Sequence, residues 1–524
     1  MKNQPATAFS EDVPNKWLIT LTVMTGTIMS ALDTSIVNVA LPYMRGNLGA
    51  SVEEVTWVAT GYILSNVIIM PIIALLSSRF GRKRFYIFSV LLFTASSILC
   101  GSAWNLSSMV VFRILQGIGG GALIPVSQAI LRETFPPEEQ GMAMGIYGLG
   151  VVLGPAIGPT LGGWLTDQYS WPWIFYINIP VGIVNLLLVS RYIQDPPYLV
   201  RERGRLDLMG LILMMTGLGA LQLMLEKGEN EDWFSSRFII SLAAIAAVGL
   251  LLFVWRELSI ERPAVNIRLL KDLTFASGTL IGGGLGIGLY ASLFLLPLFL
   301  QQLLGYPAFD SGLALMPRSA AMAVAMPLGG RLYNRLGARP LIGLGLLINV
   351  YSFWGLSRLT LDAGFMDICF PQLWQGVGFG LIFVALSTVA LSTIDRPQMT
   401  AASGLYNVVR QVFGSVGIAI SATLLTRSET TYRGILVEHL TPSRDVVNHW
   451  LTAVSGHLHN SGLQSGDAKA AALRLLESNA VRQAAMLAYD HVFLFLAAMF
   501  FTCLPLIFLL RKDKQAVVET VIGE

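Results

Sequence analysis

The sequence predicts an all-α membrane protein made of two related six-helix repeats with two further helices inserted between them, fourteen transmembrane helices in all. Three observations support this prediction. First, 54% of the 524 residues are hydrophobic and 13% are charged, whereas soluble domains carry about 25% charged residues. Second, the chain contains many apolar segments of about 20 residues, the length that crosses a bilayer as a helix. Third, short sequences from the first half recur in the second half.

The apolar segments define the spans in order along the chain. The first follows sixteen mostly polar residues and is too long for a signal-peptide core, so we expect it to be retained as a helix. The expected spans lie near residues 17–40, 55–77, 85–103, 107–131, 141–165, 173–193, 207–226, 237–255, 274–301, 308–331, 340–358, 366–393, 400–425 and 489–510. The mean hydropathy of +0.63 agrees with this membrane assignment.

Basic residues gather in alternate connections between these spans. If the N-terminus is cytoplasmic, the cytoplasmic connections hold Arg79, Arg82, Lys83, Arg84, Arg132, Arg201, Arg203, Arg205, Arg262, Arg268, Lys271, Arg331, Arg335, Arg339, Arg396 and the run from Arg511. The short loops on the other side hold Arg45, Lys227 and Arg358. The positive-inside rule therefore predicts that both termini are cytoplasmic. The polar segment 426–488 is then expected to be a long extracytoplasmic loop.

Composition and spacing exclude several other classes of function. The net charge of +3 gives no reason to expect nucleic-acid binding. The three cysteines lie far apart in apolar runs, so we expect neither a disulfide framework nor a metal site. The histidines of the 426–488 segment, His457 and His459 among them, are expected to be solvated rather than to bind metal. We find no nucleophile–base–acid set and no phosphate-binding loop, so an enzyme is not expected and no cofactor is predicted.

Internal echoes indicate that the two halves arose by duplication. "RILQGIG" from Arg113 reappears as "QLWQGVG" from Gln372, and "AMGIY" from Ala143 reappears as "ASGLY" from Ala402. "RFGRKR" has a weaker echo in "RLGARP" from Arg335. These echoes pair the second, fourth and fifth spans with the tenth, twelfth and thirteenth.

This pairing gives the expected domain organisation. An N-terminal six-helix bundle occupies residues 1–195, two inserted transmembrane helices and a linker occupy 196–270, and a C-terminal six-helix bundle occupies 271–524. Parallel repeats of this kind are typical of transporters, in which the substrate site lies near the membrane midplane between the halves.

Ionisable residues inside the spans are costly in a bilayer and are therefore candidates for function. Asp33 is the one acid that we place well inside a span, in "ALDTSIVNVALP". Burial favours the neutral form of a carboxyl group, so Asp33 is the candidate for proton coupling. Arg113 is its candidate counter-charge and would link protonation to a change of conformation. The alternatives are that Asp33 caps a backbone break or pairs statically with an arginine, and that Arg113 clamps neighbouring carbonyl groups.

The second half places two more arginines near mid-span. Arg318 and Arg410 give the spans more positive than negative groups, which favours lipophilic anions or weak acids as substrates unless these arginines pair with other helices or extend toward the membrane surface. Aromatic and polar residues nearby suit an apolar pocket for drug-like ligands. The candidate substrate contacts are Tyr62, Gln116, Tyr147, Tyr290, Phe294, Arg318, Phe383, Tyr406 and Arg410.

Glycines recur every fourth residue in the fifth span, in "GVVLGPAIGPTLGG". Gly150, Gly154 and Gly158 form one bare helix face, which lets two helices approach closely in lipid. Pro155 and Pro159 each remove a backbone donor and can bend the helix. We expect this face to be a bend and sealing surface at the interface between the halves. The alternative is simple tight packing.

Several of these stretches together resemble the major facilitator superfamily, in particular its fourteen-helix drug:proton antiporter branch, the EmrB/QacA-like transporters. The stretches are "LDTSIVNVALP" from Leu32, "ALLSSRFGRKR" from Ala74, "RILQGIGGG" from Arg113, "GVVLGPAIGP" from Gly150 and "WPWIFYINIPVG" from Trp171. The "DWFSS" segment at Asp232 and the long outer segment before the last span look most like the EmrB-type permeases.

The resemblance implies proton-driven export of hydrophobic small molecules, lipophilic weak acids among them, across the inner membrane by alternating access. It also implies a periplasmic adaptor and an outer-membrane channel as partners in a tripartite pump. Two other readings stay open: an exporter or flippase of a native lipid-like substrate such as fatty acids, and a non-transporting membrane scaffold or sensor.

The same resemblance implies a conformational lock at the loop that holds Arg79, Gly81 and Arg82. In the family, an acidic residue helps to form this lock, but Ser78 stands at its position and Ala74 stands at the position of the leading glycine. Either the lock is lost or other groups carry it.

Overall fold

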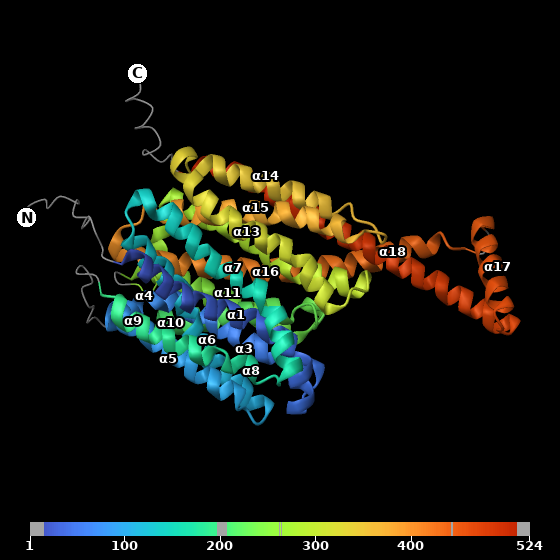
Figure 1. Cartoon of the computed structure of the whole chain (residues 1–524), viewed down its shortest axis with the longest axis horizontal. Coiled ribbons are helices and arrows are strands. Elements are labelled where there is room, and N and C mark those ends of the chain that lie inside the picture. The colour runs from blue at the N-terminus through green and yellow to red at the C-terminus, as the bar shows by residue number, and fades with distance from the viewer. Residues whose placement is uncertain (1–14, 196–206, 261–262, 264, 442–443, 511–524) are drawn as a thin grey trace, which may run out of the picture.

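The computed structural model of the chain describes residues 15–195, 207–260, 263, 265–441 and 444–510. Within these ranges the regular structure is entirely helical, and long helices run side by side in one bundle (Figure 1). Several basic groups used to predict orientation, those of 201–205, Arg262 and the run from Arg511, lie outside the described residues. The expected all-helical fold is confirmed for the part of the chain that is described.

The first half contains the helices that correspond to the first six predicted spans. They are α1 (Lys16–Leu48), α3 (Trp57–Ile69) continuing through η1 (Met70–Ile72) into α4 (Ile73–Phe80), α5 (Arg82–Gly101), α6 (Leu106–Thr134), α7 (Pro137–Gln168), α8 (Trp173–Tyr176) and α9 (Asn178–Tyr192). A short helix, α2 (Val52–Val55), joins α1 to α3 and begins with a capping box between Ser51 and Glu54. Helix α1 packs along α7, and α6 packs against both α3 and α5.

Two helices follow before the second half begins. They are α10 (Leu208–Lys227) and α11 (Arg237–Ser259), which pack along each other. Helix α10 also contacts α3 of the first half and α16 of the second half. This pair therefore lies against both halves on one side of the bundle.

The second half has the same sequence of packed helices. It consists of α12 (Leu273–Leu298), α13 (Ala308–Leu336), α14 (Ala338–Leu356), α15 (Phe365–Val389), α16 (Met399–Glu438), α17 (Asp445–Asn460) and α18 (Ser465–Thr502). Helix α12 packs along α16, and α15 packs against both α13 and α14. The pairs α12–α16 and α13–α15 thus repeat the pairs α1–α7 and α3–α6 of the first half.

One backbone feature recurs at the echoed loop of each half. Gly81 separates α4 from α5 with φ 89°, and Gly337 separates α13 from α14 with φ 78°. Positive φ is cheap for glycine and costly for residues with a side chain. The two loops therefore turn the chain in the same way, and the weak echo between "RFGRKR" and "RLGARP" reflects a shared turn.

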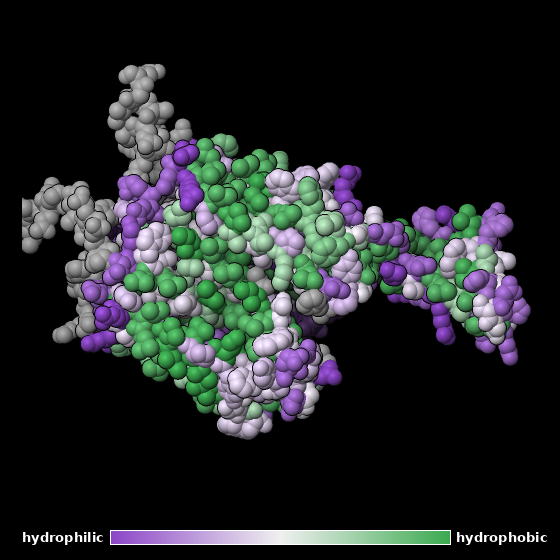
Figure 2. Space-filling view, in the orientation of Figure 1, coloured by the Kyte–Doolittle hydropathy of each residue, from purple (hydrophilic) through white to green (hydrophobic). Residues whose placement is uncertain are grey.

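Among the described residues, twelve helices are long and apolar enough to cross a membrane. Helices α13 and α14, which correspond to the tenth and eleventh predicted spans, are not among the twelve; they contain Arg318, Arg331, Arg335 and Arg339. The count of fourteen therefore stays a prediction. Apolar side chains cover the middle of the face shown in Figure 2, while hydrophilic side chains gather at the end near the termini and on the α17 projection.

The segment 426–488, which we expect to be a long extracytoplasmic loop, is largely helical. Helix α16 continues to Glu438, α18 begins at Ser465, and α17 lies between them. These parts project from the bundle at the end opposite the two termini (Figure 1). Polar residues favour exposure but do not prevent helix formation, and this segment contains few helix-breaking residues between 426 and 440.

The two halves are joined by hydrogen bonds on α6 and α16. Ser403 donates to the carbonyl oxygen of Pro125 at 3.0 Å, and Asn407 Nδ2 donates to Gln128 Oε1 at 2.8 Å. Helix α7 also packs along α13 and α15. The two hydrogen bonds lie near the end of α6 and the start of α16, so the halves are held against each other at that end of the bundle.

Candidate functional site

A buried ion pair joins α1 to α6 in the first half. Asp33 is 0% exposed, and its Oδ2 accepts a hydrogen bond from Arg113 Nη1 at 2.5 Å. Arg113 Nε also donates to the carbonyl oxygen of Val58 on α3 at 3.0 Å. Removing both charges from water is expensive, and close pairing with further hydrogen bonds offsets that cost. The structure thus pairs Arg113 with Asp33, and this geometry fits both the predicted counter-charge and the alternative of a static pair.

Polar side chains from three other positions complete this group. Gln116 Nε2 donates to Asp33 Oδ1 at 3.0 Å, and Gln116 Oε1 accepts from Arg113 at 2.8 Å. Asn178 Nδ2 lies 3.4 Å from Asp33 Oδ1 and 3.1 Å from Ser97 Oγ. We name these five residues, Asp33, Arg113, Gln116, Ser97 and Asn178, the first-half cluster. Gln116 was predicted as a substrate contact, but its bonds lie within this cluster.

Sequence reasoning missed Ser97 and Asn178. Both are buried polar residues in apolar runs, on α5 and at the start of α9. Asn178 stands in "YINIPVG", where an amide between isoleucines was the available signal. Each buried polar group in a membrane span needs a partner. Asn178 could therefore have been predicted to hydrogen-bond to another span, though not to which one.

Aromatic rings enclose the guanidinium group of Arg113. Its Cζ lies 4.3 Å from the centre of the Tyr62 ring and 5.7 Å from that of Phe175. A cation held over a desolvated aromatic face gains attraction from the ring quadrupole. Tyr62 was predicted as a substrate contact, but it packs on Arg113 and its hydroxyl lies 3.2 Å from Ser30 Oγ.

The second half holds Arg318 in a different kind of polar group. Arg318 is 5% exposed, and its Nη1 donates to Ser292 Oγ at 2.7 Å and lies 3.5 Å from Gln375 Oε1. Ser292 Oγ in turn donates to Gln375 Oε1 at 3.0 Å. These residues come from α13, α12 and α15. Over the described ranges, the ion pairs within 4 Å do not include Arg318.

Arg410 lies among aromatic side chains on α15 and α16. It is 8% exposed, and its Cζ lies 5.5 Å from the Phe383 ring centre and 6.0 Å from the Tyr406 ring centre. It shares a helix face with Ser403 and Asn407, which bond to the first half. Arg410 therefore faces the interface between the halves.

The remaining predicted substrate contacts are spread around this interface. Tyr147 is buried and donates to the carbonyl oxygen of Ile124 at 2.9 Å, and Tyr290 donates to Gln411 Oε1 at 2.9 Å. Phe294 is half-buried against the core. The predicted set thus divides into residues beside Asp33, residues beside Arg318 and residues around Arg410, rather than forming one continuous group.

The glycine face of α7 contradicts our expectation. A Cβ on Gly154 would lie 2.5 Å from the carbonyl carbon of Ala31, and one on Gly150 would meet Ile28 at 3.4 Å. Gly158 lies against Ser35. These neighbours belong to α1, so the face packs within the first half and the interpretation as a sealing surface between the halves is wrong. Helix α7 runs without interruption through Pro155 and Pro159.

Another glycine face of the same helix meets the second half. A Cβ on Gly145 would lie 2.6 Å from the carbonyl oxygen of Met326, and one on Gly141 would lie 2.8 Å from that of Gly330. Gly148 is close to Met326 and Phe383. Our error had a physical cause: small residues on two helix faces give similar spacing, and spacing alone does not show which neighbour each face meets.

At the Arg82 loop, where the resemblance implies a lock, the contacts are made by groups other than residue 78. The Arg82 side chain is buried and pairs with Glu133 at the end of α6, and its Nη2 donates to Thr400 Oγ1 of the second half at 3.0 Å. Ser78 Oγ donates to the carbonyl oxygen of Leu75 and contributes no charge. Arg79 is exposed. Thus Glu133 supplies the acid, and Thr400 joins Arg82 to the other half.

Two further acids, on the inserted helices α10 and α11, were not predicted from the sequence. Glu257, near the end of α11, is buried, and Glu226, near the end of α10, accepts a hydrogen bond from Thr60 Oγ1 at 2.6 Å. Both stand within one turn of a predicted span end, where an acid is ordinarily solvated. They fasten the inserted helices to neighbouring structure rather than lying near Asp33.

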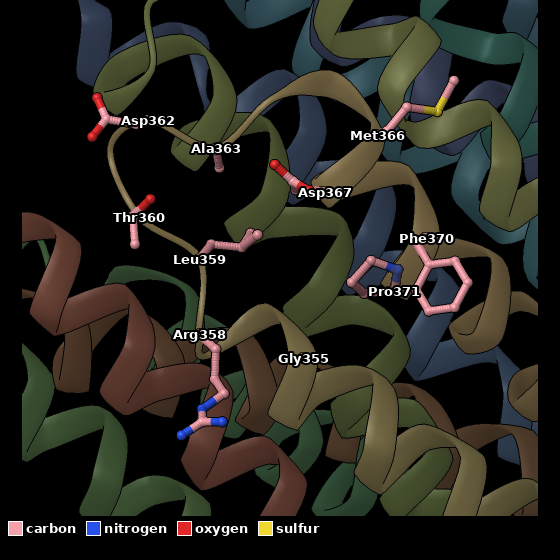
Figure 3. A pocket seen from close by; sticks show the side chains of 10 residues that line it. All are labelled: Gly355, Arg358, Leu359, Thr360, Asp362, Ala363, Met366, Asp367, Phe370 and Pro371. Atoms are coloured by element: carbon pink, nitrogen blue, oxygen red, sulfur yellow. The ribbon is translucent and has the colours of Figure 1, made fainter.

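A separate cavity of about 400 Å³ opens at the connection between α14 and α15 (Figure 3). It is lined by Gly355, Arg358, Leu359, Thr360, Asp362, Ala363, Met366, Asp367, Phe370 and Pro371. None of the predicted site residues lies in this lining. In the described part of the chain, no three histidine, cysteine or acidic side chains gather as metal ligands would.

Comparisons with known proteins agree with this architecture. The family described as Major Facilitator Superfamily matches residues 23–418. The fatty acid resistance protein FarB of Neisseria gonorrhoeae is 35% identical over 494 residues, which cover 94% of this chain and 96% of FarB. The multidrug export protein EmrB of Haemophilus influenzae is 37% identical over 426 residues, covering 81% of this chain and 83% of EmrB.

A solved structure supports the fold independently of sequence. The crystal structure of the human organic anion transporter MFSD10 matches with a TM-score of 0.57 and 14% identity, covering 93% of this chain and 100% of that chain. At this identity the likeness shows the fold alone. Taken with the family match and the helical bundle, these findings show that the chain is a multi-pass membrane transporter and not an enzyme, and that it belongs to the major facilitator superfamily.

Proposed function

We propose that this transporter exports hydrophobic small molecules from the cytoplasm in exchange for protons. The observation that carries the proposal is the fully buried carboxyl group of Asp33, held by Arg113 and Gln116. An ionisable acid inside a membrane bundle is costly to keep, and such residues mark proton or ion pathways. The relatives named as a multidrug export protein and a fatty acid resistance protein support the export direction.

The geometry gives protonation a mechanical consequence. While Asp33 is charged, its attraction for Arg113 ties α1 to α6, and Arg113 is also bonded to α3. A proton on Asp33 removes this attraction and leaves Arg113 to re-form its bonds with amide and carbonyl groups. The charged and neutral forms therefore favour different helix arrangements, and a proton shifts the transport equilibrium by its difference in affinity for the two states.

We place the substrate between the halves, around Arg410. Phe383 and Tyr406 flank the guanidinium group, and Phe383 also lies close to Gly148 of α7. An apolar surface with one charged group suits hydrophobic ligands that carry a single polar end. A lipid-like native substrate such as a fatty acid is the second candidate, which the similarity to FarB favours.

The test is proton movement in proteoliposomes driven by a substrate gradient. Wild-type protein moves protons when a hydrophobic substrate is added, and Asp33→Asn loses this movement. The matched control is Asp362→Asn, which changes an exposed acid on the loop after α14 and leaves proton movement intact. If wild-type protein neither transports nor moves protons, the scaffold reading replaces this proposal. If Asp33→Asn still exchanges protons for substrate, Asp33 is not the coupling group.

We also propose an inner-membrane location with cytoplasmic termini and a periplasmic adaptor bound to the projecting helices. The α17 region projects at the end opposite the termini (Figure 1). Its exposed apolar side chains suit a protein partner: Ile435, Val437, Val446, Leu473 and Leu475.

Cysteine labelling tests this orientation. The three native cysteines are buried, so Ser461→Cys supplies an exposed thiol on the projection. A membrane-impermeant maleimide added to cells with a permeable outer membrane labels Ser461→Cys and fails to label a cysteine at Arg79. The reverse pattern refutes the orientation. Cross-linking of the adaptor to Val446→Cys, but not to lipid-facing Leu280→Cys, tests the docking surface.

A further inference from the structure

The duplication relates the first-half cluster to the polar group around Arg318. Arg113 and Gln372, like Ala143 and Ala402, are 259 residues apart in the echoed stretches. The same spacing leads from Asp33 to Ser292 and from Gln116 to Gln375. In the structure, Ser292, Gln375 and Arg318 are indeed hydrogen-bonded to one another. The second half therefore contains the counterpart of the cluster that holds Asp33.

The counterpart has an arginine and an amide as hydrogen-bond donors, but it has no acid. Serine stands where the first half has Asp33, and glutamine stands where it has Arg113, while the arginine of the second half enters from α13 instead. The first-half cluster has one positive and one negative group, and its counterpart has only the positive one. Within the described ranges, no carboxylate lies within 4 Å of Arg318.

Two buried amide donors of this counterpart have no acceptor. Gln375 and Gln372 are 0% exposed, and Gln375 Nε2 and Gln372 Nε2 have no hydrogen-bond partner; the Oε1 atom of Gln372 is also unpaired. The hydrogen bonds of Arg318 all use Nη1. An unpaired buried charge and unpaired buried donors each cost free energy, so a fold that keeps them needs a compensating partner.

We propose that this group, Ser292, Arg318, Gln372 and Gln375, binds the carboxylate of an anionic amphiphile during transport. The proposal rests on the proposed export function and deepens it by naming the substrate class. In the first half, a carboxylate accepts hydrogen bonds from an arginine and a glutamine amide. In the second half, a substrate carboxylate takes the place of the missing aspartate, beside the shorter side chain of Ser292. Arginine and amide donors suit a carboxylate and repel a cationic headgroup.

Access to the group requires movement of the halves. At 5% exposure, Arg318 is almost closed off in this conformation. The acyl chain of the ligand then lies toward the aromatic residues around Arg410, on the interface between the halves. Electrostatic preference for anions arises because neither arginine has an acidic partner among the described residues.

Binding to purified full-length protein in lipid nanodiscs tests the proposal without any need for transport. The probe is decanoate, measured by calorimetry beside decanol and decyltrimethylammonium. We expect wild-type protein to bind decanoate at least tenfold more tightly than either analogue. Arg318→Gln removes this preference while decanol binding stays unchanged. Equal decanoate binding by wild-type protein and Arg318→Gln overturns the proposal.

Two more variants keep the test decisive. Ser292→Asp restores the acid of the first half within the protein and should weaken decanoate binding at least tenfold, without loss of folding, because the introduced carboxylate would pair with Arg318. Arg358→Gln, which changes an exposed arginine, is the matched control and binds as wild type. If acetate displaces decanoate at equal concentration, the group is a small-anion site and the substrate assignment fails. Failure of proton exchange alone, with decanoate binding intact, refutes the proposed coupling and not this site.

Discussion

In the first half of the bundle Asp33 and Arg113 neutralise each other, whereas in the second half Arg318 and Arg410 are buried with no acidic partner within 4 Å in the described ranges. The helices that hold these groups pack in the same order in both halves. The two halves thus keep polar groups at corresponding positions although their charges differ. The first half holds a paired acid, which we propose as the proton site, and the second half holds two arginines without an acidic partner within 4 Å among the described residues, which we propose as the ligand site.

The largest expected effect comes from removing each arginine in turn. Arg113→Met leaves Asp33 as a buried charge without a counter-charge, which should cost about 3–5 kcal/mol of unfolding free energy. Arg318→Met removes a cation that has no acidic partner and should cost less than about 1 kcal/mol or stabilise the protein. Unfolding in one detergent, followed by the loss of helical circular dichroism, measures both.

The double variant Asp33→Asn with Arg113→Met is the control for this comparison. It removes both charges, so we expect it to recover much of the stability lost by Arg113→Met but to remain inactive in proton exchange. If Arg113→Met and Arg318→Met lower the free energy of unfolding equally, the proposed difference in charge pairing between the two halves is wrong.

The two glycine faces of α7 separate packing within the first half from packing between the halves. Leucine at Gly154 collides with the α1 backbone, and leucine at Gly145 collides with the α13 backbone. Overpacking of this kind costs about 1–3 kcal/mol. Gly154→Leu should therefore lower the unfolding temperature, whereas Gly145→Leu should mainly force the halves apart.

The labelling rate of a cysteine at the interface measures whether the halves have separated. Ser403→Cys places a thiol where α16 meets α6, and the native cysteines are buried. We expect maleimide to react faster with this thiol in the Gly145→Leu background than in the Gly154→Leu background. Gly163→Leu is the control, since its nearest neighbour would be Val39 at an ordinary 3.8 Å. The same labelling rate in all three backgrounds would contradict the assignment of the two faces.

The sequence was sufficient to predict the helical membrane fold, the duplication and the family, because apolar runs and motifs are local properties of the chain. It also drew attention to Asp33 and Arg113, which the structure pairs, since a charge inside an apolar span is conspicuous. It did not identify Ser97 or Asn178, whose importance arises only when α5 and α9 meet α1. Contacts between residues on different helices depend on the orientation of each helix about its own axis. Because α7 has small residues on two faces, the sequence did not show which face contacts α1 and which contacts α13.

The same limit applies to the contacts of Arg82. The sequence showed that Ser78 replaces the family's acid, but not that Glu133, at the far end of another helix, supplies one. Segment 426–488 was expected to be a loop because it is polar, yet polar residues also form exposed helices when neighbours support them.

The hydrogen bond from Arg82 to Thr400 gives a prediction with a smaller expected effect. Thr400→Val removes the hydrogen bond from Arg82 that joins the halves and leaves the pair with Glu133 in place. A hydrogen bond to a charged group contributes about 1.5–3 kcal/mol, so the ratio of molecules closed at the terminal end to molecules open there should fall at least about tenfold. Faster labelling of Ser403→Cys checks this. Thr393→Val, which alters a hydroxyl that bonds within the second half, should leave labelling unchanged.

The smallest change in unfolding free energy is expected from an ion pair near the surface, between Asp207 and Arg256, in contrast to the buried pair of Asp33. Asp207 precedes α10 and bonds to Arg256 at 2.7 Å, and this hydrogen bond lowers the pKa of the Asp207 carboxyl. Because the pKa of Asp207 is lower in the folded than in the unfolded protein, the pair stabilises the protein above the unfolded pKa. This stabilisation is lost as pH falls through the folded pKa.

A third of the Arg256 side chain is exposed, so Asp207→Asn should cost about 0.2–1 kcal/mol at pH 7. Unfolding measured from pH 7 down to pH 3 should show this difference shrinking. A cost as large as that of Arg113→Met would mean that burial is not what separates the charged pairs of this molecule.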